Sequence, residues 1–300
     1  MKKSLWAIAA LLAVSATAQA QTTDTLKKIK DTGSVTMGVR GSSGALSYTL
    51  GEGKYVGFHV ELCQRAIEDI RKQLALPKLD IKYQEVTSAN RIPLVQNGTV
   101  DIECGSTTNN EARGKDVAFA HTAYVEEVRI ATHANSGITS IAQLNGKTVA
   151  TTTGTTSVQL LRKNERATGI DFKEVFGKDH ADSFLLLESG RADAFVMDGQ
   201  ILAGLISKAK NPADFAIVGE VLSVEPIAIM MRKDDPGFKA AVDKTLDGLM
   251  KSGEMAKIYD KWFMQPIPPT NTKVGLPASQ ATRDAWASPN DKPTEAYMKK

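Results

Sequence analysis

Residues 91–113 read RIPLVQNGTVDIECGSTTNNEAR and place a helix, a turn, a buried strand and a polar loop in close succession. Ser88, just before this stretch, is a candidate cap for the helix, and Asn97-Gly98 is a typical turn dipeptide. The apolar strand VDIECG (100–105) then runs directly into a loop rich in hydroxyl groups. This succession is typical of an α/β fold in which helices connect the strands of a mainly parallel sheet.

The same alternation of strands and helices, followed outward, predicts two α/β units. The first is expected to contain a helix closed by Pro77 and five extended segments: helix 60–74 and segments 35–40, 80–86, 100–105, 117–120 and 124–132. The second is expected to contain three strands and two helices: strands 148–153, 172–176 and 192–198, helix 157–167 and a helix ending at Glu188. Two units suit a chain that is too long for one small core.

The segment after Pro226 is predicted to return to the first unit. It contains one strand, 227–232, and two helices, broadly 237–251 and 254–263, and these cannot form a sheet of their own. The proline-rich tail from Pro266 is expected to be an extended wrap with a frayed end.

This return predicts a discontinuous first lobe, residues 21–126 plus 226–300, around an inserted second lobe, residues 127–225. The chain then crosses between the lobes twice. Strands near 125–131 and 221–229 are the expected hinge.

The N-terminus is typical of a secretory signal peptide. Two lysines precede an apolar run, residues 5–14, and the small-residue end AQA follows at 18–20. A membrane anchor would need roughly 20 consecutive apolar residues, and polar residues interrupt this run. We expect cleavage after Ala20 and release into a periplasm, and no cysteine follows that site to carry a lipid anchor.

The charge balance gives no indication of a nucleic acid or an anionic membrane as partner. The chain has 37 Lys and Arg against 34 Asp and Glu, and removing Lys2 and Lys3 with the leader leaves a net charge of about +1. The basic residues are spread along the chain without a block.

The two cysteines, Cys63 and Cys104, have two interpretations that the sequence does not separate. A disulfide suits an exported protein. Two buried thiols are the alternative, because Cys63 falls on the apolar face of a predicted helix and Cys104 ends an apolar strand.

Three segments combine short hydroxyl side chains with glycine or arginine where a strand meets a helix: TSANR (87–91), GSTTNNEAR (105–113) and TTTGTTS (151–157). A helix N-terminus presents unpaired N–H groups, and Arg91 or Arg113 can hold a carboxylate with two hydrogen bonds. Ordinary helix capping explains each segment taken alone. However, one junction lies in each lobe, so closure would bring two anion sites onto one ligand. The phosphate-binding motif GxxxxGK[ST] is absent, which favours a carboxylate.

Asp198 and His180 are ambiguous when each is considered alone. Asp198 ends an apolar strand, where it can pair with an ammonium group or cap the next helix. An anion site that faces a lone aspartate suggests a zwitterionic ligand. His180 at a helix start is best interpreted as a surface residue. His59, His121 and His133 are isolated, and no metal-ligand spacing occurs.

Five strings taken together resemble the periplasmic glutamate/aspartate-binding proteins of amino-acid ABC transporters: RIPLVQNGTVDIECGSTTNNEAR, GTTS, KDHADSF, LESGRADAFVMD and RKDDPGF. The likeness spans about Leu26 to Pro269. It implies the type II periplasmic-binding-protein fold, with L-glutamate or L-aspartate captured between two lobes and delivered to a membrane permease. We expect a monomer without cofactor or metal.

The resemblance also implies a role for each matching residue. The side-chain carboxylate of the ligand is assigned to four residues, Arg40, Ser88, Arg91 and His180. The main-chain groups of the ligand are assigned to Ser106, Thr108, Arg113 and Thr156, and its ammonium group to Asp198. Three arginines for two carboxylates imply selection of acidic ligands, because an uncharged side chain would leave buried arginines unpaired.

Two other classes of function compete with ligand capture. Relatives of this fold include secreted dehydratases, and His180 beside Asp182 is the one pairing that suits acid–base work, yet no nucleophile or metal accompanies it. A sensory module is the second alternative, and the absence of a fused signalling region in the sequence disfavours it. Transport is therefore the expected function.

Overall fold

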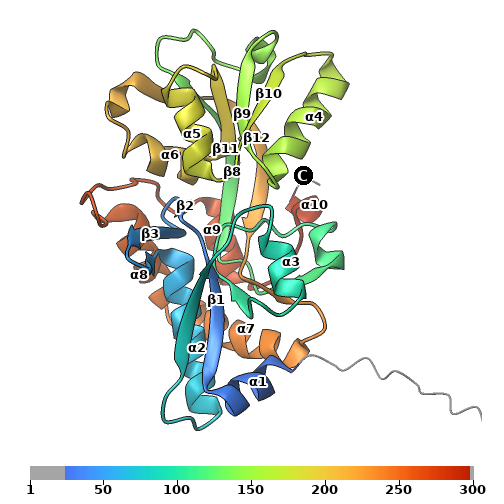
Figure 1. Ribbon diagram of the computed structural model, residues 1–300, viewed down its shortest axis with the longest axis vertical. Coiled ribbons are helices and arrows are strands. Elements are labelled where there is room, and N and C mark those ends of the chain that lie inside the picture. The colour runs from blue at the N-terminus through green and yellow to red at the C-terminus, as the bar shows by residue number, and fades with distance from the viewer. Residues whose placement is uncertain (1–23, 298–300) are drawn as a thin grey trace, which may run out of the picture.

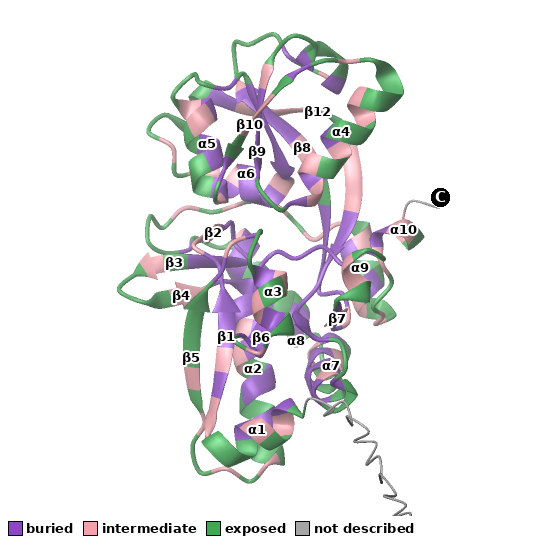
Figure 2. Ribbon diagram, turned by 45° about the vertical axis from the view of Figure 1, so that its right-hand side comes forward, coloured by how far each residue is buried: buried purple, intermediate pink, exposed green. Residues whose placement is uncertain are grey.

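The computed structural model describes residues 24–297, and the leader predicted at residues 1–20 lies outside this part. Figure 1 shows two α/β units, one above the other, joined by long strands. We call the lower unit the first lobe and the upper unit the second lobe, each defined by its central five-stranded sheet. The ribbon of Figure 2 shows buried residues along most strands of both sheets, whereas the edge strand at residues 80–85 is largely exposed.

The first lobe contains strands from both ends of the chain. Its sheet has the order β5 (Asp80–Glu85), β1 (Ser34–Val39), β6 (Ile102–Glu103), β13 (Met230–Arg232) and β7 (Val117–Phe119). A small second sheet has the order β2 (Ser42–Ser43), β3 (Ser47–Gly51) and β4 (Lys54–Val56). The helices are α1 (Thr25–Thr32), α2 (Phe58–Gln73), α3 (Arg91–Gln96), α7 (Pro236–Lys251), α8 (Glu254–Tyr259), α9 (Gln280–Ala287) and α10 (Thr294–Tyr297), with a short turn of helix at Arg113–Lys115 and a wide one at Asp260–Met264.

The second lobe is built from the middle of the chain. Its sheet has the order β10 (Lys173–Gly177), β9 (Thr148–Thr152), β11 (Ala194–Asp198), β8 (Tyr124–His133) and β12 (Phe215–Ile227). Its helices are α4 (Thr156–Thr168), α5 (His180–Glu188) and α6 (Gly199–Ile206), with short helical turns at Ile141–Leu144 and Pro212–Asp214.

Both sheets are mixed, and in this detail they differ from the mainly parallel sheets expected. In the first lobe, β1 pairs in parallel with β5 and β6, whereas β13 runs antiparallel to β6 and β7. In the second lobe, β9 pairs in parallel with β10 and β11, whereas β8 runs antiparallel to β11 and β12. The antiparallel strands are those that carry the chain between the lobes or back from the second lobe. An α/β fold of two helix-covered sheets is as predicted.

The long strands β8 and β12 connect the lobes. They pair from Tyr124 opposite Ile227 to His133 opposite Phe215, with an irregularity between Val218 and Ser223. Figure 1 shows them side by side between the two units. The lobe boundaries predicted at residues 126/127 and 225/226 fall within these strands and stay a prediction.

The predicted strand 227–232 is wrong as a single element. Ile227 is the last residue of β12, and β13 begins only at Met230. The apolar run continues unbroken because both strands are buried, so its pattern does not reveal that the chain passes from one sheet to the other.

Helix α2 packs its predicted apolar face, with both cysteines, into the larger hydrophobic cluster of the first lobe. Val60, Cys63, Ile67 and Ile70 are buried on one face of α2, as the helical spacing predicts. Cys63 forms a disulfide with Cys104, which lies just after β6. The interpretation as two thiols is therefore wrong.

The tail after Pro266 is more ordered than an extended wrap. Ser279 caps α9, and Thr282 of that helix accepts a hydrogen bond of 3.1 Å from the backbone N–H of Val125 at the start of β8. Trp286 donates to the carbonyl oxygen of Ala123 at 2.8 Å. The expected extended wrap is wrong over 280–287, because capping and burial against the hinge stabilise a helix there, and the expected frayed end beyond residue 297 lies outside the described residues.

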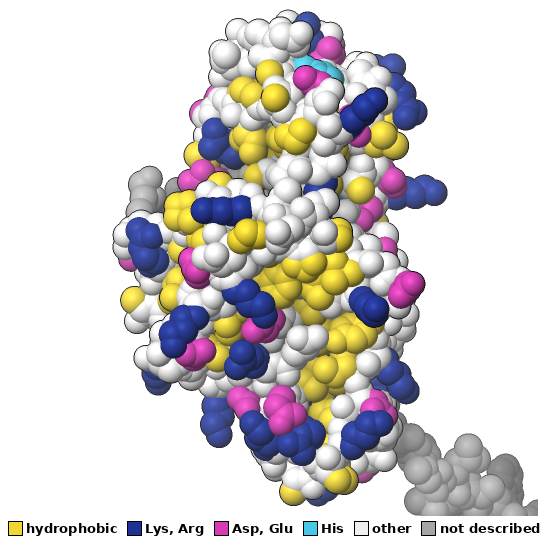
Figure 3. Space-filling view, turned by 90° about the vertical axis from the view of Figure 1, so that its left-hand side faces the viewer, with side chains coloured by type: hydrophobic (Ala, Val, Ile, Leu, Met, Phe, Trp, Pro, Cys, Tyr) yellow, Lys and Arg dark blue, Asp and Glu magenta, His cyan; other side chains and the backbone are white. Residues whose placement is uncertain are grey.

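The surface carries both signs of charge. Basic and acidic side chains are interspersed over the face shown in Figure 3. Between residues 24 and 297, no helix is long and apolar enough to cross a membrane.

Candidate functional site

Three arginines lie where the lobes meet. Arg40 follows β1, Arg91 begins α3, and Arg113 begins the short helical turn after the polar loop. Arg40 is fully buried and Arg91 is 2% exposed, and Nε and Nη1 of both have no hydrogen-bond partner among residues 24–297. Burial and the charge of Arg113 hold the pKa of Arg91 well below its usual value. Buried guanidinium N–H groups without partners form a site that favours an anion.

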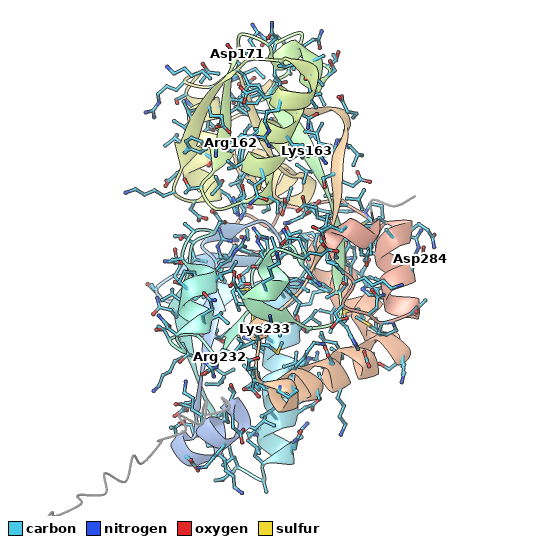
Figure 4. All side chains as sticks on the ribbon, turned by 90° about the vertical axis from the view of Figure 1, so that its right-hand side faces the viewer. Arg162, Lys163, Asp171, Arg232, Lys233 and Asp284 are labelled. Atoms are coloured by element: carbon cyan, nitrogen blue, oxygen red, sulfur yellow. A yellow bond between two sulfur atoms is a disulfide. The ribbon has the colours of Figure 1, made fainter. Side chains whose placement is uncertain are left out.

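Arg162 and Arg232, which lie away from this region, are each paired with an acid. Figure 4 labels Arg162 in the second lobe, where it pairs with Glu174 at 3.0 Å, and Arg232 in the first lobe, where it pairs with Asp101 at 3.3 Å. By contrast, Arg91 and Arg113 make no ion pair within the described residues. Arg91 and Arg113 are thus the arginines of this region that can still form an ion pair with a ligand.

Arg40 brings three side chains together. Its Nη2 donates to Ser88 at 3.0 Å and to Asp179 at 2.8 Å, and it lies 3.2 Å from Nε2 of His180. Ser88 therefore does not cap α3, whose N-cap position is Asn90. Asp179 and His180 belong to the second lobe, so this cluster crosses the space between the lobes.

His180 is buried, and its interpretation as a surface residue is wrong. Arginine can only donate, so the contact between Nη2 of Arg40 and Nε2 of His180 suits the tautomer with the proton on Nδ1, which lies 3.0 Å from Thr152 Oγ1. Burial and the charge of Arg40 lower the pKa of His180 to about 3. The imidazole is therefore neutral at neutral pH.

A second cluster joins the two hydroxyl-rich junctions. Thr108 of the first lobe and Thr156 of the second both donate to Oε2 of Glu225, at 2.7 and 2.8 Å. Arg113 donates through Nη1 to the carbonyl oxygen of Thr108 at 2.9 Å and through Nη2 to that of Gly154 at 3.3 Å. The predicted convergence of one junction from each lobe is present in the structure.

Ser106 and Asp198 complete the set of predicted residues. Ser106 hydrogen-bonds to Ser43 at 3.0 Å. Asp198 occupies the N-cap position of α6, yet its side chain makes no capping hydrogen bond, so the capping interpretation is wrong. Burial and the charge of Glu225 raise the pKa of Asp198 to about 7. A cation beside this carboxyl would favour its charged form.

Two acidic residues of this region were missed from the sequence. Asp179 accepts from Arg40 and also from Ser42, at 2.5 Å. Glu225 lies on the hinge strand β12 in a segment without any motif. Each resembles an ordinary cap or strand residue locally, and its partners are distant in the chain: Arg40 lies 139 positions from Asp179, and Thr108 and Thr156 lie 117 and 69 positions from Glu225.

The acid–base pairing considered for an enzyme is not formed. Asp182 is exposed, whereas His180 is buried and contacts Arg40 and Thr152. Among the residues that the structure describes, no group of three or more His, Cys, Asp or Glu side chains is arranged to hold a metal ion.

Residues 35–265 match the bacterial extracellular solute-binding proteins, family 3. The chain belongs to this family. The match covers the polar junctions of both lobes and both hinge strands, and it ends before the tail that contains α9 and α10. This family 3 protein is thus an extracellular solute-binding protein by family, which agrees with the predicted resemblance.

Curated relatives of this family 3 protein cover nearly its whole length. It is 45% identical over 289 residues to the L-glutamate/L-aspartate-binding protein of Pseudomonas aeruginosa, covering 96% of this chain and 95% of the relative. It is 42% identical to the glutamate/aspartate import solute-binding protein of Escherichia coli, covering 97% and 98%.

Solved structures agree on the fold. A mutant of ArgBP from T. maritima superposes with a TM-score of 0.71 at 28% identity, covering 80% of this chain and 99% of that one. An ancestral arginine-binding protein bound to arginine gives a TM-score of 0.69 at 28% identity, covering 77% and 98%. The type II periplasmic-binding-protein fold is therefore confirmed.

Proposed function

We propose that this family 3 protein captures L-glutamate or L-aspartate and delivers it to the permease of an ABC importer. The observation that carries the proposal is the pair Arg40 and Arg91, buried at one end of the site with Nε and Nη1 of both unpartnered among the described residues. Such a pair favours a ligand side chain that carries negative charge.

The ligand's two ends are assigned to different clusters. Its side-chain carboxylate is held by Arg40, Ser88, Arg91 and His180. Its main-chain carboxylate is held by Arg113, with Ser106, Thr108 and Thr156 beside the main-chain groups, and Asp198 receives the ammonium group. An amide side chain in place of the carboxylate would leave the buried guanidinium group of Arg91 without a counter-charge and Arg40 with Asp179 alone, which costs several kcal/mol.

Capture proceeds by closure of the lobes 21–126 plus 226–300 and 127–225 about strands β8 and β12. Contacts that cross between the lobes support this mechanism. Asp179 of the second lobe bonds Ser42 of the first at 2.5 Å, and Arg113 of the first bonds Gly154 of the second at 3.3 Å. The bound ligand adds further contacts to both lobes and so favours the closed state.

The site of action is the periplasm, and the protein acts as a monomer. The predicted leader, with cleavage after Ala20, supports export, as does membership in an extracellular family. Relatives named as import and binding proteins support a permease partner.

The proposal is tested by calorimetric titration of ligand-stripped protein with L-glutamate, L-aspartate, L-glutamine and L-asparagine in parallel. We expect tight one-to-one binding of the two acids and much weaker binding of both amides. Recovery of unchanged ligand after release checks that no reaction occurs. Preference for the amides would refute the assignment of Arg40 and Arg91, and binding of none of the four would refute the function.

A further inference from the structure

Glu225 is a buried carboxylate that none of the assigned ligand roles uses. It lies on β12, is 3% exposed, and stands opposite Glu126 of β8 in the antiparallel pair that connects the lobes. Its side chain reaches one residue from each lobe, Thr108 and Thr156. A buried charge is retained at some cost in stability, so its contacts indicate what it does.

The direction of these hydrogen bonds follows from elementary chemistry. An ionised carboxylate can only accept, and each threonine hydroxyl has a single proton. Both hydroxyls give that proton to the same oxygen, Oε2 of Glu225, at 2.7 and 2.8 Å. Each threonine oxygen can then accept a hydrogen bond from the ligand but has no proton left to donate.

Two acceptors of this kind suit a group that only donates. The α-ammonium group of an amino acid carries three N–H bonds and no lone pair, whereas a carboxylate needs donors. Arg113, which donates beside Thr108, is the matching donor for the α-carboxylate. Thr108 and Thr156 are thus suited to accept from the ammonium group, and Arg113 is suited to donate to the α-carboxylate.

We propose that Glu225 is a positioning residue that turns Thr108 and Thr156 into hydrogen-bond acceptors, so that the site demands an α-ammonium group on its acidic ligand. The proposal rests on the function proposed above and adds the origin of its selectivity for amino acids over plain dicarboxylates. Glu225 acts on the ligand indirectly, by orienting the hydroxyl groups of the two threonines.

Other charged groups around Glu225 are consistent with this role. Asp198 and Arg113 are electrostatically coupled to it, and Glu126 faces it from β8. Glu126 is itself held by the backbone N–H of Glu127, at 2.9 Å. Acidic groups therefore surround the place where the ammonium group is expected, with Arg113 beside them as the donor for the α-carboxylate.

The test compares L-glutamate with glutarate, which has the same two carboxylates and no ammonium group. In Glu225→Met, the threonine hydroxyls lose their acceptor and become free to rotate. We expect glutamate affinity to fall about 10- to 100-fold, the usual cost of a lost charged hydrogen bond, while glutarate affinity changes less than about threefold. Equal loss for both ligands would show a merely structural residue and overturn the proposal.

Two further variants distinguish an effect of Glu225 on hydroxyl orientation from an effect of its negative charge. Glu225→Gln keeps an acceptor oxygen, and we expect it to recover at least about tenfold of the glutamate affinity lost in Glu225→Met. No recovery would attribute the effect to charge and overturn the role of the threonines. Thr156→Val, at a half-buried helix start, is expected to lower the affinity for glutamate and to leave the affinity for glutarate unchanged. Loss of glutarate binding in this variant would show that Thr156 donates to a carboxylate.

Glu220→Gln on the exposed part of the same strand is the matched control and should bind both ligands like the parent. Thermal unfolding of each variant without ligand checks the fold. If the parent protein fails to bind glutamate at all, the proposed function fails. If the parent binds and the selectivity is unchanged in Glu225→Met, only the role of Glu225 fails.

Discussion

Gly154 of the second lobe touches the backbone of Ala89 in the first. A β-carbon at residue 154 would lie 2.7 Å from Cα and 2.8 Å from the backbone nitrogen of Ala89. Gly154 also has a φ of +82°, which a side chain disfavours. The contact between the lobes therefore requires a residue without a β-carbon at this position.

Gly154→Ala should weaken glutamate binding at least about tenfold, because backbone cannot move aside cheaply and the closed state is lost. Gly169→Ala is the control: its φ is +71°, yet nothing lies within 4 Å of an added β-carbon. Both variants should lose about 1–2 kcal/mol of unfolding free energy from backbone strain. Calorimetry and thermal unfolding separate the two effects, and equal affinities would rule out the clash.

Arg113→Ala should abolish binding of every amino acid. Arg113 is the donor assigned to the α-carboxylate, which all amino acids share, and its Nη2 also bonds Gly154 of the second lobe. We expect losses of more than about 100-fold for glutamate and aspartate alike, as for truncation of one member of a buried charge pair. An affinity within tenfold of the parent would contradict the assignment.

Arg91→Ala should weaken the binding of glutamate more than the binding of glutamine. Arg91 is buried and makes no ion pair among residues 24–297, so a ligand carboxylate is its expected partner. The variant should lose at least about tenfold more affinity for glutamate than for glutamine, because only glutamate brings a charge to this end of the site. Parallel titrations measure the ratio, and equal weakening of the two ligands would remove Arg91 from the side-chain subsite.

Ligand binding should weaken as the pH falls through the pKa of Asp198. Burial and Glu225 raise the pKa of Asp198 to about 7, while Arg91 and Arg113 act in the opposite direction. The ligand's ammonium group favours the charged carboxylate, so binding releases a proton below that pH. Affinity should therefore fall from about pH 8 to about pH 5, by up to tenfold per unit at the lower end. His180, with a pKa of about 3, contributes nothing in this range.

Stability without ligand should show the opposite trend. In the unfolded chain an aspartate titrates near about pH 4, so between about 4 and 7 the folded state binds more protons at Asp198. Its contribution to the free energy of unfolding accordingly declines as pH rises through this window. Asp198→Asn should flatten both profiles, and a profile unchanged by this substitution would show that another group titrates.

The disulfide should contribute to stability without setting affinity. It joins Cys63 and Cys104 across 41 positions, and a loop of this length predicts a loss of about 2–4 kcal/mol of unfolding free energy when both become alanine. Neither cysteine is assigned to the ligand. The double variant should melt at lower temperature and keep glutamate affinity within about threefold at temperatures where it is folded, as titration can check.

Much of the fold was predictable because local patterns of apolar residues indicate its helices and strands. The spacing of Val60, Cys63, Ile67 and Ile70 predicts α2, and short apolar runs predict β1, β9 and β11 at nearly the residues observed. The division of 227–232 between two strands and the helices of the tail were not predicted. Both depend on which surface the chain packs against, and periodicity carries no information about that.

The sequence by itself determined the family, the two α/β units and the residue types that gather at their junctions, because strand ends and helix starts leave recurrent local signatures. Only the tertiary structure decided that Cys63 and Cys104 are bonded, that His180 is buried and neutral, and that Asp179 and Glu225 join the site. These facts depend on contacts between residues far apart in the chain, such as the 117 positions between Thr108 and Glu225. A hydrogen bond requires its atoms within about 3 Å, and only the packing of one lobe against the other brings such residues that close.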